Sequence, residues 1–267
     1  MSAYSSSRVV FILIDGLRPD AISQAACPNL YALMQRSAYS LTARAVMPSI
    51  TLPCHMSIFH SVPPDRHGIL TNTWQPMARP VQGLVEVIAE HDKRAAFFIN
   101  WEPLRDLARP GSLTHLFFLK NNRDFEQGDA RIAQESAYYI LNYLPDFSFV
   151  YFGSLDEFAH DVGWMSTQYL EQLGRVDNAL GELLKSLPDD YTLLLQSDHG
   201  GHERHHGTDL DEDMLIPWMV SGPGIRKDYR IARDVNLLDT APTIACIFGL
   251  DSPSSWEGSC IREIFEQ

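Results

Sequence analysis

The chain of 267 residues has few cysteines, no recognisable leader and no long apolar run. The N-terminal sequence MSAYSSSR lacks the apolar core of a signal peptide, and no apolar run approaches membrane-spanning length. The cysteines are far apart, with no C-x-x-C pair, which favours free thiols in a reducing compartment over a disulfide framework. We therefore expect a cytoplasmic, soluble protein that does not contact a membrane. The four cysteines are Cys27, Cys54, Cys246 and Cys260.

Positive charge is also scarce, because 21 Lys and Arg residues stand against 34 Asp and Glu residues, for a formal net charge of −13. Binding to a nucleic-acid polymer needs clustered Lys and Arg, so we do not expect such a polymer as a partner. A nucleotide is not excluded, since bound metal cations can supply local positive charge. Much of the acid excess is expected simply to keep the surface soluble.

The length and the hydrophobic fraction of 45% fit one large α/β domain with a good core. Strand and helix patterns alternate along the chain, which predicts a doubly wound, mostly parallel sheet with helices on both faces. The pattern is weak over residues 101–127, where we expect a loop-rich insertion. The predicted organisation is therefore a single catalytic domain over residues 1–267.

Three apolar segments have the character of strands buried on both faces of a parallel sheet. They are RVVFILIDG (8–16), FSFVYFGSLDEFAH (147–160) and YTLLLQSDHGGHERHHGTD (191–209). In such sheets, ligands bind beyond the carboxyl ends of the strands. The polar residues that follow these apolar runs are therefore candidates for a functional site.

Each of these three strands runs into an aspartate: Asp15, Asp156 and Asp198. His160 and His199 follow two of them, and carboxylate with imidazole is a ligand set that suits zinc and related divalent metals. Any single aspartate is more simply explained as a helix cap. Three together, with several imidazoles close by, favour a metal site. Three further histidines complete the last segment: His202, His205 and His206.

Thr51 is the candidate nucleophile. Pro53 fits the first turn of a helix, which places Thr51 at or just before the helix N-terminus, a position suited to anions. A hydroxyl there can attack phosphorus if a metal lowers its pKa, and two metals about 4 Å apart support in-line displacement. This predicts a phospho-threonine intermediate that is later hydrolysed. The simpler alternative for this segment alone is an ordinary N-cap.

Four motifs carry a family resemblance over nearly the whole chain: ILIDGLRPD, MPSITLPCH followed by PPDRHGI, SLDEFAH, and SDHGG. With the closing segment IPWMVSGPGI…LLDTAPTIACIFGL, the chain resembles the alkaline phosphatase superfamily, and within it the nucleotide pyrophosphatase/phosphodiesterase branch. The formylglycine-type sulfatase motif is absent. The resemblance implies two divalent metals, with zinc expected and manganese compatible with the same ligands.

The resemblance also assigns the metal ligands. It implies one metal held by Asp15, Thr51, Asp198 and His199, and a second held by Asp156, His160 and a later histidine. We choose His206 as that histidine, because HHGTD followed by a strand and GPG resembles compact members of the superfamily. His202 is the alternative, and His205 is expected to face away.

Two positions concern the substrate. The diesterase branch usually has an asparagine three residues after the nucleophile, whereas this chain has Cys54, a poor hydrogen-bond donor. Cys54 and Asn72 are the candidate substrate contacts. The chain is also shorter than typical nucleotide pyrophosphatases, so part of the usual substrate-binding insertion is expected to be missing.

The expected function is hydrolysis of phosphodiester or pyrophosphate bonds in a small phosphate ester, a nucleotide among the candidates. A phosphomonoesterase or a phosphonate hydrolase uses the same chemistry, and Arg18, Arg66 or Asn72 could then bind the additional phosphate charge. The third hypothesis is not an enzyme but a metal-stabilised binding protein without turnover. The sequence does not indicate an oligomeric state.

Overall fold

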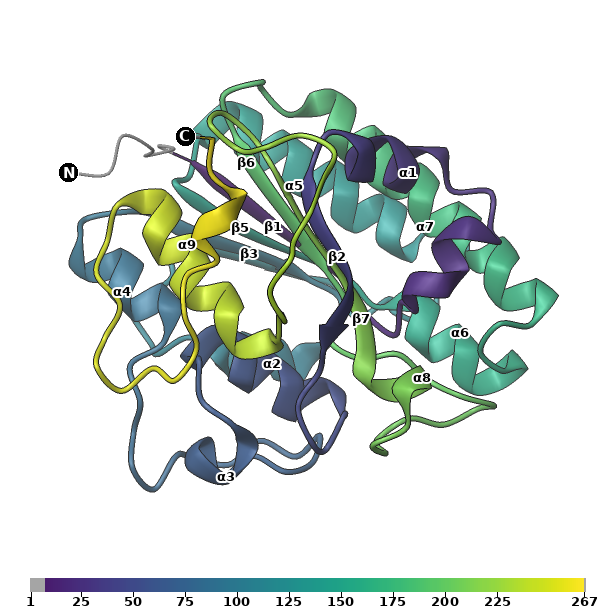
Figure 1. Ribbon diagram of the computed structural model, residues 1–267, viewed down its shortest axis with the longest axis horizontal. Coiled ribbons are helices and arrows are strands. Elements are labelled where there is room, and N and C mark those ends of the chain that lie inside the picture. The colour runs from purple at the N-terminus through teal and green to yellow at the C-terminus, as the bar shows by residue number, and fades with distance from the viewer. Residues whose placement is uncertain (1–7, 267) are drawn as a thin grey trace.

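The computed structural model describes residues 8–266. One eight-stranded sheet forms its centre, in the order β4-β3-β5-β1-β6-β7-β2-β8 (Figure 1). The strand pairs are parallel except that β7 runs antiparallel to β6 and β2. The strands are β1 (Val9–Ile14), β2 (Ala38–Arg44), β3 (Ala95–Ile99), β4 (His115–Phe118), β5 (Phe147–Phe152), β6 (Thr192–Gln196), β7 (Leu215–Ser221) and β8 (Tyr229–Arg230).

Helices cover both faces of the sheet (Figure 1), which confirms the predicted doubly wound α/β fold. Apolar residues of α2 (Thr51–His60), α4 (Leu84–Glu90) and α9 (Thr240–Phe248) pack into the core on one face. Those of α1 (Pro28–Gln35), α5 (Gly128–Tyr143), α6 (Ser154–Val162) and α7 (Thr167–Ser186) form the core on the other. Two further short helices are α3 (Pro64–His67) and α8 (Asp211–Met214). The 3₁₀ helices are η1 (Pro19–Ser23), η2 (Glu102–Leu107), η3 (Leu237–Asp239) and η4 (Arg262–Ile264).

The three strands at the centre end at nearly the same level. Strand β1 lies between β5 and β6, and all three are buried along their whole length. Ile14 pairs with Phe152, and Leu13 pairs with Gln196. The residues that directly follow these strands therefore emerge side by side at one edge of the sheet.

Every residue of helix α2 is buried, which is unusual because a helix that covers a sheet normally exposes one face to solvent. It begins at Thr51 after the extended N-cap Ile50, and it ends where Ser61 adopts the left-handed conformation. Because all its faces are packed, the position of its first residue is fixed tightly by the core.

The segment 101–127 is more regular than expected. It contains η2 and the edge strand β4, which pairs in parallel with β3. It therefore extends the central sheet in addition to forming loops. Within residues 8–266, none of the helices combines the length and the apolar character that crossing a membrane requires.

Candidate active site

Three carboxylates meet at the carboxyl edge of the central strands. Asp15 directly follows β1, Asp198 lies two residues after β6, and Asp156 lies in the first turn of α6 after β5. All three side chains are buried. The level strand ends explain this meeting, which the sequence predicted from three apolar runs that each lead to an aspartate.

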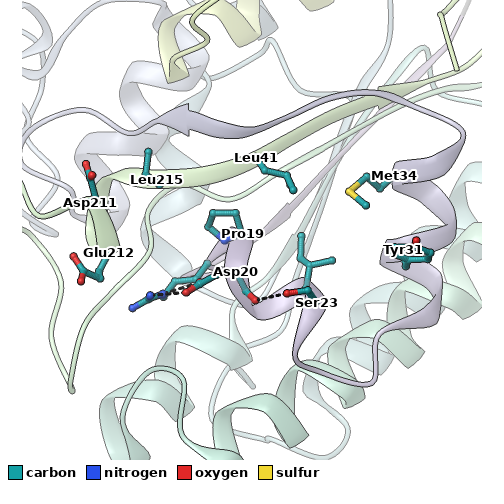
Figure 2. A pocket seen from close by; sticks show the side chains of 11 residues that line it. Pro19, Asp20, Ser23, Tyr31, Met34, Leu41, Asp211, Glu212 and Leu215 are labelled. Carbon is teal, nitrogen blue, oxygen red and sulfur yellow. Dashed lines mark hydrogen bonds and ion pairs between the residues drawn. The ribbon is translucent and has the colours of Figure 1, made fainter. Parts of the chain in front are cut away.

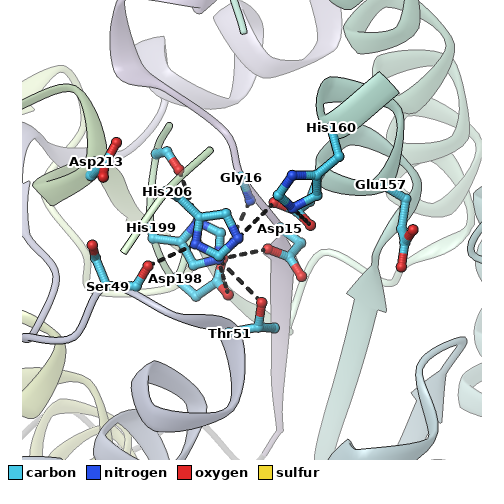
Figure 3. A network of polar contacts seen from close by, with 12 residues as sticks. Asp15, Gly16, Ser49, Thr51, Glu157, His160, Asp198, His199, His206 and Asp213 are labelled. Carbon is cyan, nitrogen blue, oxygen red and sulfur yellow. Dashed lines mark hydrogen bonds and ion pairs between the residues drawn. The ribbon is translucent and has the colours of Figure 1, made fainter. Parts of the chain in front are cut away.

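The first group of ligand atoms surrounds the imidazole of His199. Its Nε2 lies 3.3 Å from Asp15 Oδ1 and 3.4 Å from Asp198 Oδ2. The same nitrogen lies 3.2 Å from the hydroxyl oxygen of Thr51 (Figure 3). The N-cap of α2 is Ile50, so Thr51 does not cap the helix and its hydroxyl faces this group.

The second group surrounds Asp156. His160 is four residues later on α6, on the same helical face, and its Nε2 lies 3.4 Å from Asp156 Oδ2. The Nε2 of His206 lies 3.8 Å from Asp156 Oδ1. The rings of His160 and His206 have centroids 5.1 Å apart. One turn of α6 and a loop that is distant in the sequence therefore together supply the side chains of the second group.

Three imidazoles are oriented by backbone carbonyls. A carbonyl can only accept a hydrogen bond, so Nδ1 donates, and in the neutral ring Nε2 keeps its lone pair toward the carboxylates. Such an outer contact is typical of metal-binding histidines. The pairs are His160 with Arg204 O at 2.9 Å, His199 with Gly200 O at 2.9 Å, and His206 with Ser49 O at 2.8 Å.

The other two histidines of this loop have different surroundings. His202 Nδ1 lies 2.7 Å from Asp213 Oδ1, and the Asp213 carboxylate also accepts hydrogen bonds from Thr208. His205 is exposed, and its backbone pairs with that of His202. The structure thus places His206 at Asp156, whereas His202 stabilises the loop.

Three buried carboxylate oxygens lack a hydrogen-bond donor among the described residues: Asp15 Oδ1, Asp156 Oδ1 and Asp198 Oδ2. Each instead faces an imidazole nitrogen. Buried polar atoms without donors are costly, and a bound cation would compensate this cost. Candidate ligand atoms also fall within 4.8 Å of one another in two groups, Asp15 with Asp198 and His199, and Asp156 with His199 and His206. The residues present therefore fit divalent metal ions.

The pKa shifts in the first group are those expected of residues that bind a metal ion. Burial raises the pKa of Asp15 well above its usual value, and the neighbouring Asp198 and Asp156 carboxylates add to the rise. Burial likewise raises the pKa of Asp198 to about 8 and lowers the pKa of His199 well below its usual value. A cation would reverse the cost of ionising these carboxyls, and a neutral His199 is the form that binds metal.

In the second group the pKa shifts of the carboxylate and of its partner imidazole have the opposite sign. Burial alone would raise the pKa of Asp156, but the hydrogen bond from His160 and the nearby imidazoles of His199 and His206 lower it overall. The same contact with Asp156 raises the pKa of His160 to about 9. In the metal-free protein these two groups therefore form an ion pair.

Supporting residues that the sequence did not single out lie directly behind the carboxylates. The Tyr151 hydroxyl donates a hydrogen bond to Asp15 Oδ2. Gly16 has φ +67°, and an added Cβ would lie 3.0 Å from Asp156 Oδ1. A tyrosine in a buried, largely apolar strand was the available signal for Tyr151, and nothing in the local sequence indicated the role of Gly16.

A family model described as type I phosphodiesterase/nucleotide pyrophosphatase matches residues 9–219. The chain belongs to this family. The match includes every one of the predicted metal ligands and Thr51, and it confirms the resemblance inferred from the four motifs.

Individual relatives of this phosphodiesterase-family chain are distant. GPI ethanolamine phosphate transferase 2 of Eremothecium gossypii is 23% identical over 96% of this chain and 35% of its own length. A pyrophosphatase/phosphodiesterase of Schizosaccharomyces pombe is 25% identical over 73% of this chain and 44% of its own. The chain thus spans less than half the length of either. An inactive form of murine ectonucleotide pyrophosphatase/phosphodiesterase 5 in complex with AMP shares the fold, with TM-score 0.83, 15% identity, and coverage of 97% of this chain and 100% of that one.

The two predicted substrate contacts differ in accessibility. Asn72 is exposed, and its Oδ1 accepts a hydrogen bond of 3.0 Å from the backbone N–H of Leu52, the residue after Thr51. Cys54 is fully buried, with its sulfur 4.0 Å from Val46 O and 3.9 Å from Pro48 O. The structure therefore supports a position beside the nucleophile for Asn72 and gives no surface contact for Cys54.

A cavity of about 730 Å³ lies between η1, α1, β2 and α8 in this phosphodiesterase-family fold (Figure 2). Its walls are largely apolar, with Ile22, Leu41 and Leu215 among them, and none of the predicted metal ligands lines it. Arg18 borders it and is held by Asp20, at 2.7 and 3.0 Å, and by Gly201 O at 3.0 Å. The cavity is therefore separate from the metal-ligand groups, and Arg18 is engaged at its border.

Proposed function

We propose that this chain is a metal-dependent phosphodiesterase in which the Thr51 hydroxyl attacks phosphorus. The observation that carries the proposal is the position of Thr51 Oγ1, 3.2 Å from His199 Nε2, at the point where the Asp15 and Asp198 carboxylates converge. Asp15, Thr51, Asp198 and His199 would hold one metal ion, and Asp156, His160 and His206 the other. Such a pair activates the nucleophile and stabilises the leaving oxygen.

Side chains of the protein position the nucleophile and the phosphate group. The buried helix α2 holds Thr51 rigidly at its first turn, where the helix dipole favours a phosphate anion. Asn72 uses its Oδ1 to bind Leu52 N, and its Nδ2 has no hydrogen bond to another described residue. We propose that this amide donates to a non-bridging oxygen of the bound phosphate. The expected intermediate is an ester of phosphate with Thr51.

A diester is favoured over a monoester because both candidate cations are held elsewhere. Arg18 binds Asp20 and Gly201 O, and Arg66 forms an exposed ion pair of 2.8 Å with Glu257. A monoester carries one more negative charge than a diester and needs an additional partner for it. The family description supports phosphodiester or pyrophosphate bonds, and the AMP bound by the murine structural neighbour is the monoester that cleavage of an adenine nucleotide diester or pyrophosphate would release.

Transfer to an acceptor hydroxyl is the second candidate. The transferase relatives from Eremothecium gossypii and human are 23% and 25% identical over 96% and 97% of this chain. The same threonine ester can be cleaved by water or by an alcohol, so the first chemical step is shared. Adding a small alcohol such as ethanolamine during turnover would reveal a new ester product if transfer occurs.

The test is a rate comparison on one purified preparation. The protein is stripped with chelator, restored with zinc or manganese, and given a chromogenic phosphodiester and the matching monoester. We expect faster cleavage of the diester, no cleavage without metal, and loss of at least about a thousandfold in Thr51→Ala, whose fold and most of whose metal binding should persist. Faster monoester cleavage would contradict the diesterase assignment. Metal binding without cleavage of diester, monoester or phosphonate would favour the inactive binding protein.

A further inference from the structure

A buried polar network lies behind the first turn of α6, the helix that carries Asp156 and His160. Its centre is Asp129, in the first turn of α5. The other members directly follow β3, begin α6 and lie on α7. No member is more than 5% exposed, and none is a predicted metal ligand. The four residues are Asn100, Asp129, Ser154 and Gln172.

Three hydrogen bonds connect this network. Asn100 Nδ2 donates to Asp129 Oδ1 at 2.9 Å, and the Ser154 hydroxyl donates to Asp129 Oδ2 at 2.5 Å. Gln172 Nε2 donates to the Ser154 hydroxyl oxygen at 2.9 Å. Ser154 is the first residue of α6, so side chains from two other helices hold the start of this helix.

Asp129 acts in this network as an ionised acceptor. Asn100 Oδ1 is buried and has no donor among the described residues. Turning the amide over would bring this oxygen against the carboxylate, where two acceptors repel each other, so the bond to Asp129 decides how the amide lies. Burial raises the pKa of Asp129 to about 6, although the hydrogen bonds from Ser154 and Asn100 oppose this rise. At pH 8 the carboxylate is therefore charged.

The first turn of α6 is also closely packed against its surroundings. A Cβ added to Gly153, the N-cap of α6, would lie 2.9 Å from Asn100 Oδ1. A Cβ added to Gly16, in the loop after β1, would lie 3.1 Å from Asp156 Cα. Because no space separates these backbones, a displacement of the α6 start changes the position of Asp156 relative to the loop that carries Asp15.

We propose that Asp129 is a positioning residue of the active site. By binding Ser154 and Asn100, it fixes the first turn of α6 and keeps the second group of metal ligands in register with the first. Asp129 itself holds neither metal nor substrate, and it acts through α6. The inference rests on the proposed function, because only a site for two ions needs both groups of ligands in register.

Asp177 supplies a matched control elsewhere in the fold. It is a fully buried aspartate of α7, and its carboxylate accepts hydrogen bonds from the backbone N–H groups of Asn29 at 3.1 Å and Leu30 at 2.7 Å. These residues begin α1, which carries none of the predicted metal ligands. Asp177→Asn therefore removes the same kind of contact, between a buried carboxylate and a helix start, without disturbing α6.

The first measurement is the zinc affinity of Asp129→Asn, by competition with a chelator on the full chain at pH 8. The second ion is identified as the one lost in His206→Ala. We expect it to bind about 10- to 100-fold more weakly, while the first ion keeps its affinity. Asp177→Asn should lose stability to urea but bind both ions as the parent does. Unchanged binding of the second ion, equal weakening of both ions, or the same loss in Asp177→Asn would overturn the proposal.

A milder variant tests the network if Asp129→Asn does not fold. Ser154→Ala removes the hydroxyl between Asp129 and Gln172 without removing a charge, and it should weaken the second ion about tenfold. Ser136→Ala is its control, because this buried hydroxyl donates to Ala133 O within its own helix, at 2.9 Å. An unchanged affinity in Ser154→Ala would contradict the positioning role.

Turnover of the chromogenic diester separates this inference from the diesterase assignment. In the zinc-restored protein, Asp129→Asn should lower kcat and leave KM within about threefold, since Thr51 and Asn72 stay in place. A parent that cleaves no phosphoester, but whose Asp129→Asn variant loses the second ion, would refute the proposed function and support the positioning role. An active parent whose Asp129→Asn variant keeps both ions and the full rate would refute the positioning role alone.

Discussion

The imidazoles of His199 and His206 stack face to face, with ring centroids 3.8 Å apart and an angle of 12° between the planes. His199 presents its Nε2 to Asp15, Asp198 and the nucleophile, whereas His206 presents its own to Asp156. The stacked pair therefore joins the two ligand groups.

His206→Ala should remove one metal ion and leave the other. The variant loses an Nε2 ligand at Asp156 but keeps the Asp15, Asp198 and His199 group intact. We expect the metal content by elemental analysis to fall by about one ion per chain and the diesterase rate to fall by more than about a hundredfold. His205→Ala, an exposed neighbour, is the matched control. Full metal content in His206→Ala would show that another residue is the ligand.

Tyr151→Phe should weaken metal binding without unfolding the protein. The hydroxyl of Tyr151 orients the Asp15 carboxylate, and removing an outer-shell donor of this kind typically costs about 10- to 100-fold in metal affinity or activity. Competition with a chelator measures the change. Tyr139→Phe, in a stack with His115 away from the site, serves as control. An unchanged affinity would mean that Asp15 is oriented by the other contacts alone.

The metal-free protein should lose stability as pH rises from about 7.5 to about 9. Burial raises the pKa of Asp198 to about 8, and the Asp156 contact raises that of His160 to about 9, so the folded state holds protons that the unfolded state releases. Each proton that the folded state holds and the unfolded state releases lowers the free energy of unfolding by about 1.4 kcal/mol per pH unit. The His160 share is smaller, since its side chain is 37% exposed.

Urea unfolding at several pH values, with and without metal, measures this slope. Five histidines have pKa values lowered by burial and would oppose the trend near pH 6.5, where they lose protons only in the unfolded state: His55, His60, His67, His115 and His199. Above about pH 7.5 they are neutral in both states and no longer affect the slope. Saturating metal should flatten the slope, because it stabilises the ionised carboxylates. A metal-free protein whose stability rises over this range would contradict the electrostatic account.

Much of the site could be predicted because it depends on local patterns. Three apolar runs that lead to Asp15, Asp156 and Asp198 specify both the strands and the edge at which their carboxylates meet. The spacing of Asp156 and His160 places both on one helical face. The family match over residues 9–219 confirms the family that these motifs indicated.

Other parts depend on contacts between distant residues and could not be read locally. The sequence HERHH has no periodicity that distinguishes its histidines, so the choice of His206 rested on the family resemblance. In the structure His206 is oriented by Ser49 O, from a segment more than 150 residues earlier. Cys54 was a candidate substrate contact, but every side of α2 is packed, so its thiol is inside the core. The cytoplasmic location and the identity of the metals stay predictions.

The stereochemical course at phosphorus tests the central claim most directly. Each in-line displacement inverts phosphorus, so attack by Thr51 followed by hydrolysis of the threonine ester gives overall retention. The measurement is hydrolysis of a single diastereomer of a chiral phosphorothioate diester in isotopically labelled water, with the configuration of the product determined. Our account predicts retention. Inversion would show that water attacks the substrate directly and that Thr51 is not the nucleophile.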